Sequence, residues 1–228
     1  MFLHEHPYPP FFPENATKLI VGTLPPPRFS IGKLKEGDVD FCYGSSDGLL
    51  WRVLDKLFNL KLKFETTEEA VNQRKEFLAS RKIGICDIVA SAERQKIDAS
   101  DLGMQNPKLR DVISYLKKYP KIDTLIFTGG NSKNGPEYFF RKHLKMYNLK
   151  LEIVSNEIPR QHKFELFTAI TNNKTLNTIR TIKTISLTAP SGAANRAIGS
   201  MDLYKQLKNK NPNFNTFDFR LMQYKEVF

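Results

Sequence analysis

Three short apolar runs in this sequence end in residues that could bind or transform a ligand. The first ends in Gly22-Thr23-Leu24-Pro25, the second in Asp87, and the third in Pro190-Ser191-Gly192. A buried carboxylate at the end of an apolar run needs hydrogen-bond partners or a raised pKa. An ionised Asp87 would accept a ring N–H from a ligand, and a protonated one would donate to a carbonyl. The alternative is that Asp87 caps a neighbouring loop.

The runs that precede these residues have the length and composition of buried strands. Strands are expected at 18–22, 83–89, 124–128, 149–155 and 182–187. Helices are expected at 49–58, 68–81, 107–119, 136–146 and 201–208, with Asp47 as the N-cap of the first. A further helix is expected near 164–171, within the polar span 156–180.

Short strands that alternate with amphipathic helices predict an α/β fold. We expect a three-layer α/β/α sandwich whose central sheet has four to five mostly parallel strands. No proline- or serine-rich linker divides the 228 residues, so we expect a single domain over 1–228, with 1–16 as an extended N-terminal arm. In such sheets, ligands bind outside the carboxyl ends of the strands. The three unusual strand ends should therefore converge on one site.

The chain is strongly basic. It has 35 Lys and Arg against 24 Asp and Glu, a formal net charge of +11 and a pI near 9.6. A surplus of this size attracts polyanions, because each phosphate that Lys or Arg neutralises releases counterions. Nucleic acid is therefore the leading partner class, although lysines that simply face water would give the same composition.

Composition also argues against several classes of protein. The two cysteines, Cys42 and Cys86, are too few for a disulfide framework or for the ligands of an iron–sulfur cluster. No Cys/His spacing suits zinc. The N-terminus lacks a basic region followed by an apolar run, and no stretch approaches the roughly 20 apolar residues that cross a bilayer. We therefore expect a cytoplasmic protein with no metal, no cofactor and no membrane contact.

Five segments, in this order along the chain, form a recognisable set. They are LIVGTLPPPRFSIGK, FCYGSSDGLLWRVLDKLF, IGICDIVASAERQKID, LIFTGG and LTAPSGAANRAIG. Together they resemble the conserved blocks of the uracil-DNA glycosylase superfamily, nearest its hypoxanthine-DNA (deoxyinosine) glycosylase-like and mismatch-specific branches. The resemblance extends from about Pro7 to Ile198. Each segment alone is a loose match, and the set is fairly specific.

The resemblance implies a protein that holds a base flipped out of DNA and reads it by stacking and edge hydrogen bonds. By position, Tyr43 would stack on the base and Asp87 would read its edge. Gly22, Thr23 and Leu24 would lie at the base. The implied DNA-binding residues, some through backbone N–H groups, are Pro25, Ser191, Gly192, Ala193, Asn195 and Arg196. The alternatives are an ordinary loop aromatic for Tyr43, a turn organiser for Asn195 and a solvated side chain for Arg196.

Both positions that carry the catalytic side chain in the resembled families lack a polar group here. Leu24 stands two residues after the glycine of the first motif. Gly48 stands three residues before Trp51, where the hypoxanthine-like branch has asparagine. Three explanations are open: Asp47 turns inward and holds the attacking water, Gly48 replaces an asparagine, or the chain binds bases without hydrolysing them.

The resulting expectation is a monomeric, monofunctional DNA glycosylase that excises uracil or hypoxanthine in base excision repair. No lysine stands at an evident strand end, so Schiff-base lyase chemistry is not expected. The alternative is a non-hydrolytic module of the same fold that binds modified or flipped bases. A nucleotide-binding or acyl-transfer protein is disfavoured, because the Gly-x-Gly-x-x-Gly, Gly-Lys-Ser/Thr and Gly-x-Ser-x-Gly motifs are absent.

Overall fold

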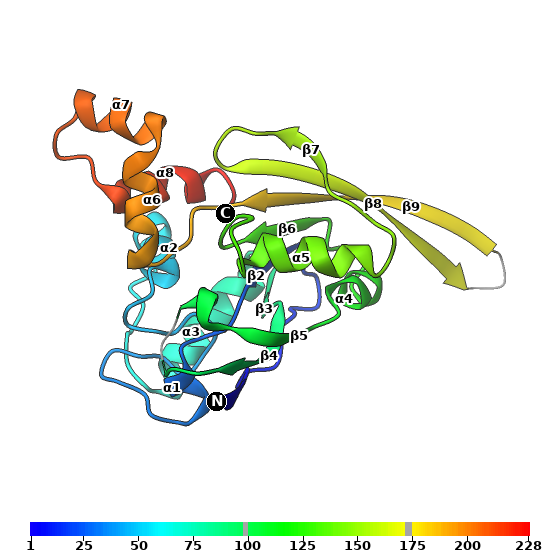
Figure 1. Ribbon diagram of the computed structural model, residues 1–228, viewed down its shortest axis with the longest axis horizontal. Coiled ribbons are helices and arrows are strands. Elements are labelled where there is room, and N and C mark those ends of the chain that lie inside the picture. The colour runs from blue at the N-terminus through cyan, green and yellow to red at the C-terminus, as the bar shows by residue number, and fades with distance from the viewer. Residues whose placement is uncertain (98–99, 172–174) are drawn as a thin grey trace.

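The computed structural model describes residues 1–97, 100–171 and 175–228 (Figure 1). Within them, six strands form the main sheet, in the order β3-β2-β6-β9-β8-β7. These strands are β2 (Lys18–Gly22), β3 (Ile83–Asp87), β6 (Thr124–Phe127), β7 (Glu152–Ser155), β8 (Arg160–Thr171) and β9 (Thr175–Ser186). The first four strands in the order are parallel, and β8 and β7 are antiparallel to their neighbours. The mixed α/β fold with a mostly parallel sheet is confirmed, but the expectation of four to five strands was too low.

Apolar residues on both sides of the sheet explain its place in the core. Strand β3 is buried at all five positions, as expected for a strand covered on both faces. Alternate residues of β2 feed two different hydrophobic clusters: Leu19 and Val21 pack with α4 and α5, whereas Ile20 packs with α2, α3 and α8. The carboxyl ends of the parallel strands are thereby fixed on a rigid frame.

Five of the eight helices in the described residues were expected, some with errors at their starts, and those at Pro27–Ser30, Asn195–Ser200 and Thr216–Lys225 were not. They are α1 (Pro27–Ser30), α2 (Leu50–Phe58), α3 (Glu68–Ser80), α4 (Val112–Lys118), α5 (Pro136–Lys145), α6 (Asn195–Ser200), α7 (Asp202–Lys210) and α8 (Thr216–Lys225), with 3₁₀ turns at Asp101–Gly103 and Gly192–Ala194. Asp47 is not the N-cap of α2, because the helix begins after Leu49 and has no side-chain cap. Of the helices in the described residues, none has both the length and the apolar character to cross a bilayer.

A second, antiparallel sheet brings the N-terminal arm to the main sheet. Its strands, in the order β1-β4-β5, are β1 (Phe2–Glu5), β4 (Val89–Arg94) and β5 (Gln105–Leu109). The run expected as one strand, 83–89, is thus divided between β3 and β4. The helix expected at 107–119 begins only at Val112, because Pro107 lies in β5 and Asp111 caps the helix by accepting from the Ser114 N–H.

The polar span 156–180 contains a strand, and the helix expected near 164–171 was wrong. Phe164 and Leu166, two residues apart, are both buried, which is the period of a strand. Strands β8 and β9 pair in continuous register from Arg160↔Ser186 to Thr171↔Thr175. Strand β9 therefore begins at Thr175, well before the expected 182. Figure 1 shows these two strands running beyond the rest of the sheet.

Candidate functional site

The predicted strand ends converge on a pocket of about 230 Å³. We call it the strand-end pocket. It is lined by Thr23, Leu24, Pro25, Pro26, Tyr43, Gly44, Ser45, Asp47, Gly48, Asp87, Asp101, Thr128, Ala189, Pro190 and Ser191. The parallel register explains the convergence, since Gly22 of β2 pairs directly with Asp87 of β3. The lining therefore includes most of the residues that the sequence singled out.

A short backbone bridge joins two segments that are far apart in the sequence. Gly48 pairs with Ser191 in an isolated antiparallel bridge, and the Leu49 N–H donates to the Pro190 carbonyl at 2.8 Å. One wall of the strand-end pocket is formed where Gly48 and Leu49 meet the loop 187–191, which we call the closing loop. Gly48 is thus part of the backbone pairing that forms the pocket wall.

The fully buried Arg220 of α8 holds the closing loop in place. Its guanidinium donates to the carbonyls of Ala189 and Ser191 at 3.0 and 2.7 Å. It also donates to the Asn195 side-chain oxygen at 3.0 Å and to the Thr216 carbonyl. Asn195, the first residue of α6, is therefore linked to α8 through its side-chain oxygen. Gly192 and Ala193, in the 3₁₀ turn that follows, and Arg196, in α6, are exposed and do not line the strand-end pocket.

Asp87 is 5% exposed and is oriented by a histidine from the N-terminal arm. Its Oδ2 lies 2.8 Å from His6 Nε2. The Tyr8 backbone N–H donates to His6 Nδ1 at 3.1 Å, so Nδ1 is the acceptor and Nε2 carries the proton given to Asp87. Asp87 Oδ1 is buried and has no hydrogen-bond partner among the described residues. A carboxylate with one oxygen held and the other uncommitted is an acceptor for a ligand N–H.

Tyr43 lies close to the uncommitted oxygen of Asp87, since a Cβ on Gly22 would meet both the Tyr43 hydroxyl and Asp87 Oδ1. Its phenol hydroxyl lies 2.8 Å from Thr128 Oγ1, at the end of β6, and its ring lines the strand-end pocket. The backbone of Tyr43 is in the left-handed region, with φ of 58°, a conformation that is uncommon for non-glycine residues. Burial, and then the nearby Asp87 carboxylate, raise the pKa of Tyr43 well above its usual value. The hydroxyl therefore stays protonated at the inner end of the pocket.

Gly22 provides the space for this arrangement. A Cβ at this position would overlap both the Tyr43 hydroxyl and Asp87 Oδ1. We expect Gly22→Ala to displace Tyr43 from Thr128 and to lower the free energy of unfolding by about 1–3 kcal/mol, as overpacking does. Urea denaturation measures the change. Gly192→Ala is the matched control, because a Cβ there meets nothing within 4 Å. Equal unfolding midpoints for the two variants would contradict this account of Gly22.

Asp47 lies at the rim of the strand-end pocket. Its side chain is 72% exposed and its Oδ2 lies 3.3 Å from an Arg28 guanidinium nitrogen. Arg28 is bound more closely by Asp38, at 2.7 and 2.9 Å through two nitrogens. The inward orientation that a water-holding role for Asp47 requires is therefore not the one observed. Leu24, at one of the two positions where the resemblance implies a catalytic side chain, is 8% exposed and apolar.

A third carboxylate of the strand-end pocket, Asp101, was not singled out from the sequence. It opens the 3₁₀ turn Asp101–Gly103, and its Oδ1 accepts from the Thr23 hydroxyl at 2.8 Å. Burial raises the pKa of Asp101 from 3.8 to about 6, against the lowering effects of the Thr23 hydrogen bond and the Arg94 charge. Asp101 thus changes its protonation state close to neutral pH.

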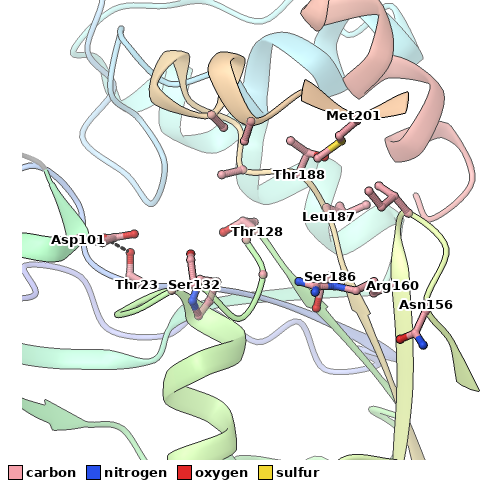
Figure 2. Close-up of a pocket in the computed structure, with 18 residues that line it drawn as sticks. Thr23, Asp101, Thr128, Ser132, Asn156, Arg160, Ser186, Leu187, Thr188 and Met201 are labelled. Carbon is pink, nitrogen blue, oxygen red and sulfur yellow. Dashed lines mark hydrogen bonds between the residues drawn. The ribbon is translucent and has the colours of Figure 1, made fainter. Parts of the chain in front are cut away.

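Asp101 also lines a larger cavity beside the strand-end pocket. This adjoining cavity has a volume of about 520 Å³ and shares Thr23, Asp101, Thr128 and Ala189 with the strand-end pocket. Figure 2 shows Asp101 and Thr23 on one side of it, Met201 and Thr188 across from them, and Arg160 at a third side. The two cavities therefore meet at the Thr23–Asp101 pair.

No protein-family model matches this chain, and no curated protein matches it. In the described part of the chain, no three His, Cys, Asp or Glu side chains are grouped so that they could hold a metal ion. What the site offers is a set of carboxylates and hydroxyls at the strand ends.

Proposed function

We propose that this chain is a monofunctional DNA glycosylase of the uracil-DNA glycosylase type, with the three-layer α/β/α arrangement of that superfamily. In this proposal a deaminated base, uracil or hypoxanthine, is flipped out of DNA into the strand-end pocket, and its N-glycosidic bond is hydrolysed. The single observation that supports it most is the uncommitted Oδ1 of Asp87, held at the inner end of the pocket by the His6 hydrogen bond to Oδ2.

The charge distribution favours a base over a phosphate as the occupant of the pocket. Asp47, Asp87 and Asp101 all line it, although the chain as a whole has a net charge of +11. Carboxylates repel phosphate and accept hydrogen bonds from N–H groups. Uracil and hypoxanthine both present a ring N–H beside a carbonyl. A basic protein with an acidic pocket therefore suits a neutral, N–H-bearing base carried by a polyanion.

Entry of a base would change the contacts of Tyr43. Its hydroxyl lies near Asp87 Oδ1, and that oxygen is buried, so in this proposal the phenol moves aside to let a base N–H reach it. The moved ring would then be free to stack on the base, which contributes about 1–3 kcal/mol. The loops that carry Pro25 and Ser191 border the pocket, and the exposed Arg196 lies beyond the second of them, where a DNA strand would pass.

A non-hydrolytic base-binding module is the second candidate. It is favoured by the apolar Leu24 and by Gly48, which leave both expected catalytic positions without a polar side chain. This candidate uses the same pocket and the same Asp87, so only the fate of the glycosidic bond separates the two functions.

A strand-cleavage assay on labelled oligonucleotides separates them. Uracil, hypoxanthine and a T·G mismatch are presented to the natural chain and to Gly48→Asn, and alkali cuts any abasic site. We expect the natural chain to cut the uracil or hypoxanthine strand. A Cβ at Gly48 would lie 3.0 Å from the backbone oxygen of Ser45, so this carbonyl must move by a few tenths of an ångström to admit the asparagine, and the urea unfolding midpoint of the variant is measured beside its activity.

Each other outcome has a definite meaning. Cutting by the Gly48→Asn form alone would make the natural chain a binding module whose missing group is an asparagine at 48. No cutting by either form would reject the glycosylase on these substrates. Binding of a duplex with a single uracil in preference to the undamaged duplex would then support the module.

A further inference from the structure

The adjoining cavity lies beside the strand-end pocket and could supply water to a base held there. The strand-end pocket, at about 230 Å³, is small, whereas the adjoining cavity is about 520 Å³. One carboxylate, Asp101, lines both. Figure 2 shows it at the edge of the larger cavity with its hydrogen bond to Thr23. A group in this place can contact a base on one side and a water on the other.

The Thr23 hydrogen bond also brings this carboxylate to the loop where catalysis is expected. Thr23 directly precedes Leu24, the position that carries the catalytic side chain in the resembled families. The 2.8 Å hydrogen bond from the Thr23 hydroxyl to Asp101 Oδ1 therefore brings a carboxylate close to position 24, where this chain has an apolar side chain. Among the described residues the hydrogen bond to the Asp101 side chain comes from Thr23 and goes to Oδ1, and Asp101 lines both cavities.

We propose that Asp101 is the general base of this site and replaces the side chains absent at positions 24 and 48. The inference rests on the proposed glycosylase function. The carboxylate takes a proton from a water in the adjoining cavity as the water oxygen bonds to C1′ of the sugar. The C1′–N bond breaks, its electron pair leaves with the base, and the proton passes from Asp101 to the departing base or to solvent. The products are the free base and an abasic site.

Burial of Asp101 supports this role through its pH dependence. With a pKa near 6, the carboxylate is ionised and able to accept a proton at pH 7–8. Excision should therefore rise as the pH passes 6 and level off above it. The same shift gives a readout that is independent of activity. Between pH 4 and 6 the folded chain holds this proton more tightly than the unfolded chain, so the Asp101 contribution destabilises the fold as pH rises.

The test is the substitution Asp101→Asn. It keeps the shape of the side chain, and the amide oxygen can still accept the hydrogen bond from the Thr23 hydroxyl. We expect excision of uracil or hypoxanthine to fall by about 100-fold or more, as loss of a general base does. Affinity for a duplex with a non-hydrolysable 2′-fluoro lesion should stay within about threefold. The variant should also unfold at a higher urea concentration than the natural chain at pH 8, and at an equal one near pH 3.5. Asp202→Asn, which alters an exposed carboxylate, is the matched control for all three measurements.

The outcomes separate this inference from the function on which it rests. Excision by Asp101→Asn at the natural rate would overturn the role of Asp101 and leave the glycosylase intact. Equal losses in excision and in affinity for the 2′-fluoro duplex would make Asp101 a binding residue and also overturn it. If the natural chain binds that duplex but cuts no lesion, both the hydrolytic function and the role of Asp101 as general base are rejected, and the base-binding function is kept.

Discussion

Asp87→Asn should reduce the affinity of the chain for a deaminated base by about tenfold to a hundredfold. The substitution keeps the size of the side chain, and the amide oxygen can still accept from His6. The amide nitrogen then takes the place of Oδ1, so that a donor faces the ring N–H of the base where an acceptor stood. A hydrogen bond to a charged group contributes about 1.5–3 kcal/mol, and facing donors lose all of it.

Fluorescence anisotropy with two labelled duplexes measures this effect. One duplex carries a single 2′-fluoro uracil and the other is undamaged. We expect the loss of affinity only on the first, because binding to the undamaged duplex depends on phosphates and not on the pocket. Asp202→Asn should change neither affinity. If Asp87→Asn weakens both duplexes equally, or neither, Asp87 does not read the base.

Arg220→Met should lower the free energy of unfolding by about 3–5 kcal/mol, since each buried acceptor left without a donor costs about 1–3 kcal/mol. The carbonyls of Ala189, Ser191 and Thr216 would all lose a donor. No ion-pair partner of Arg220 lies in the described residues, and burial lowers its pKa. The hydrogen bonds to carbonyls are therefore what hold this buried cation in place.

Chemical denaturation in urea gives this free energy directly. Arg196→Met is the control: it removes an exposed arginine from the nearby helix α6, and its effect should be within about 0.5 kcal/mol. Arg220→Lys should recover only part of the stability, because an ammonium group cannot reproduce the planar fork of the guanidinium. A midpoint for Arg220→Met that equals that of the control would show that the loop is held by other contacts.

The parts of the fold that sequence patterns predicted are those set by local composition. The strands β2, β3 and β6 are apolar runs buried on both faces, and glycine or a polar residue marks their ends. The β8 strand was missed because its stability comes from pairing with β9 along its whole length. Its polar start, Arg160 to Lys163, gives no strong local signal, and only the spacing of Phe164 and Leu166 indicated a strand.

The same distinction applies to the site. Gly22 and Asp87 could be placed together because neighbouring parallel strands share a register, and they do pair. The positions of His6 and Asp101 in the site could not be predicted from the sequence. His6 reaches Asp87 because β1 pairs with β4, and Asp101 reaches Thr23 from a 3₁₀ turn in a segment without a motif. Thr128 was expected as the last residue of the strand 124–128 but directly follows β6, and it carried a usable signal in the sequence TGG.

The bonds of His6 and Arg220 have a consequence for the synthesis of this protein. His6 orients the carboxylate at the inner end of the pocket, and Arg220 fixes the loop that closes it. During translation the first of these residues leaves the ribosome long before the second. The central strands can pair in the meantime, but the pocket is completed only when α8 emerges. A nascent chain, or a fragment trimmed by a protease at either side, would therefore keep much of its sheet and yet lack a complete strand-end pocket.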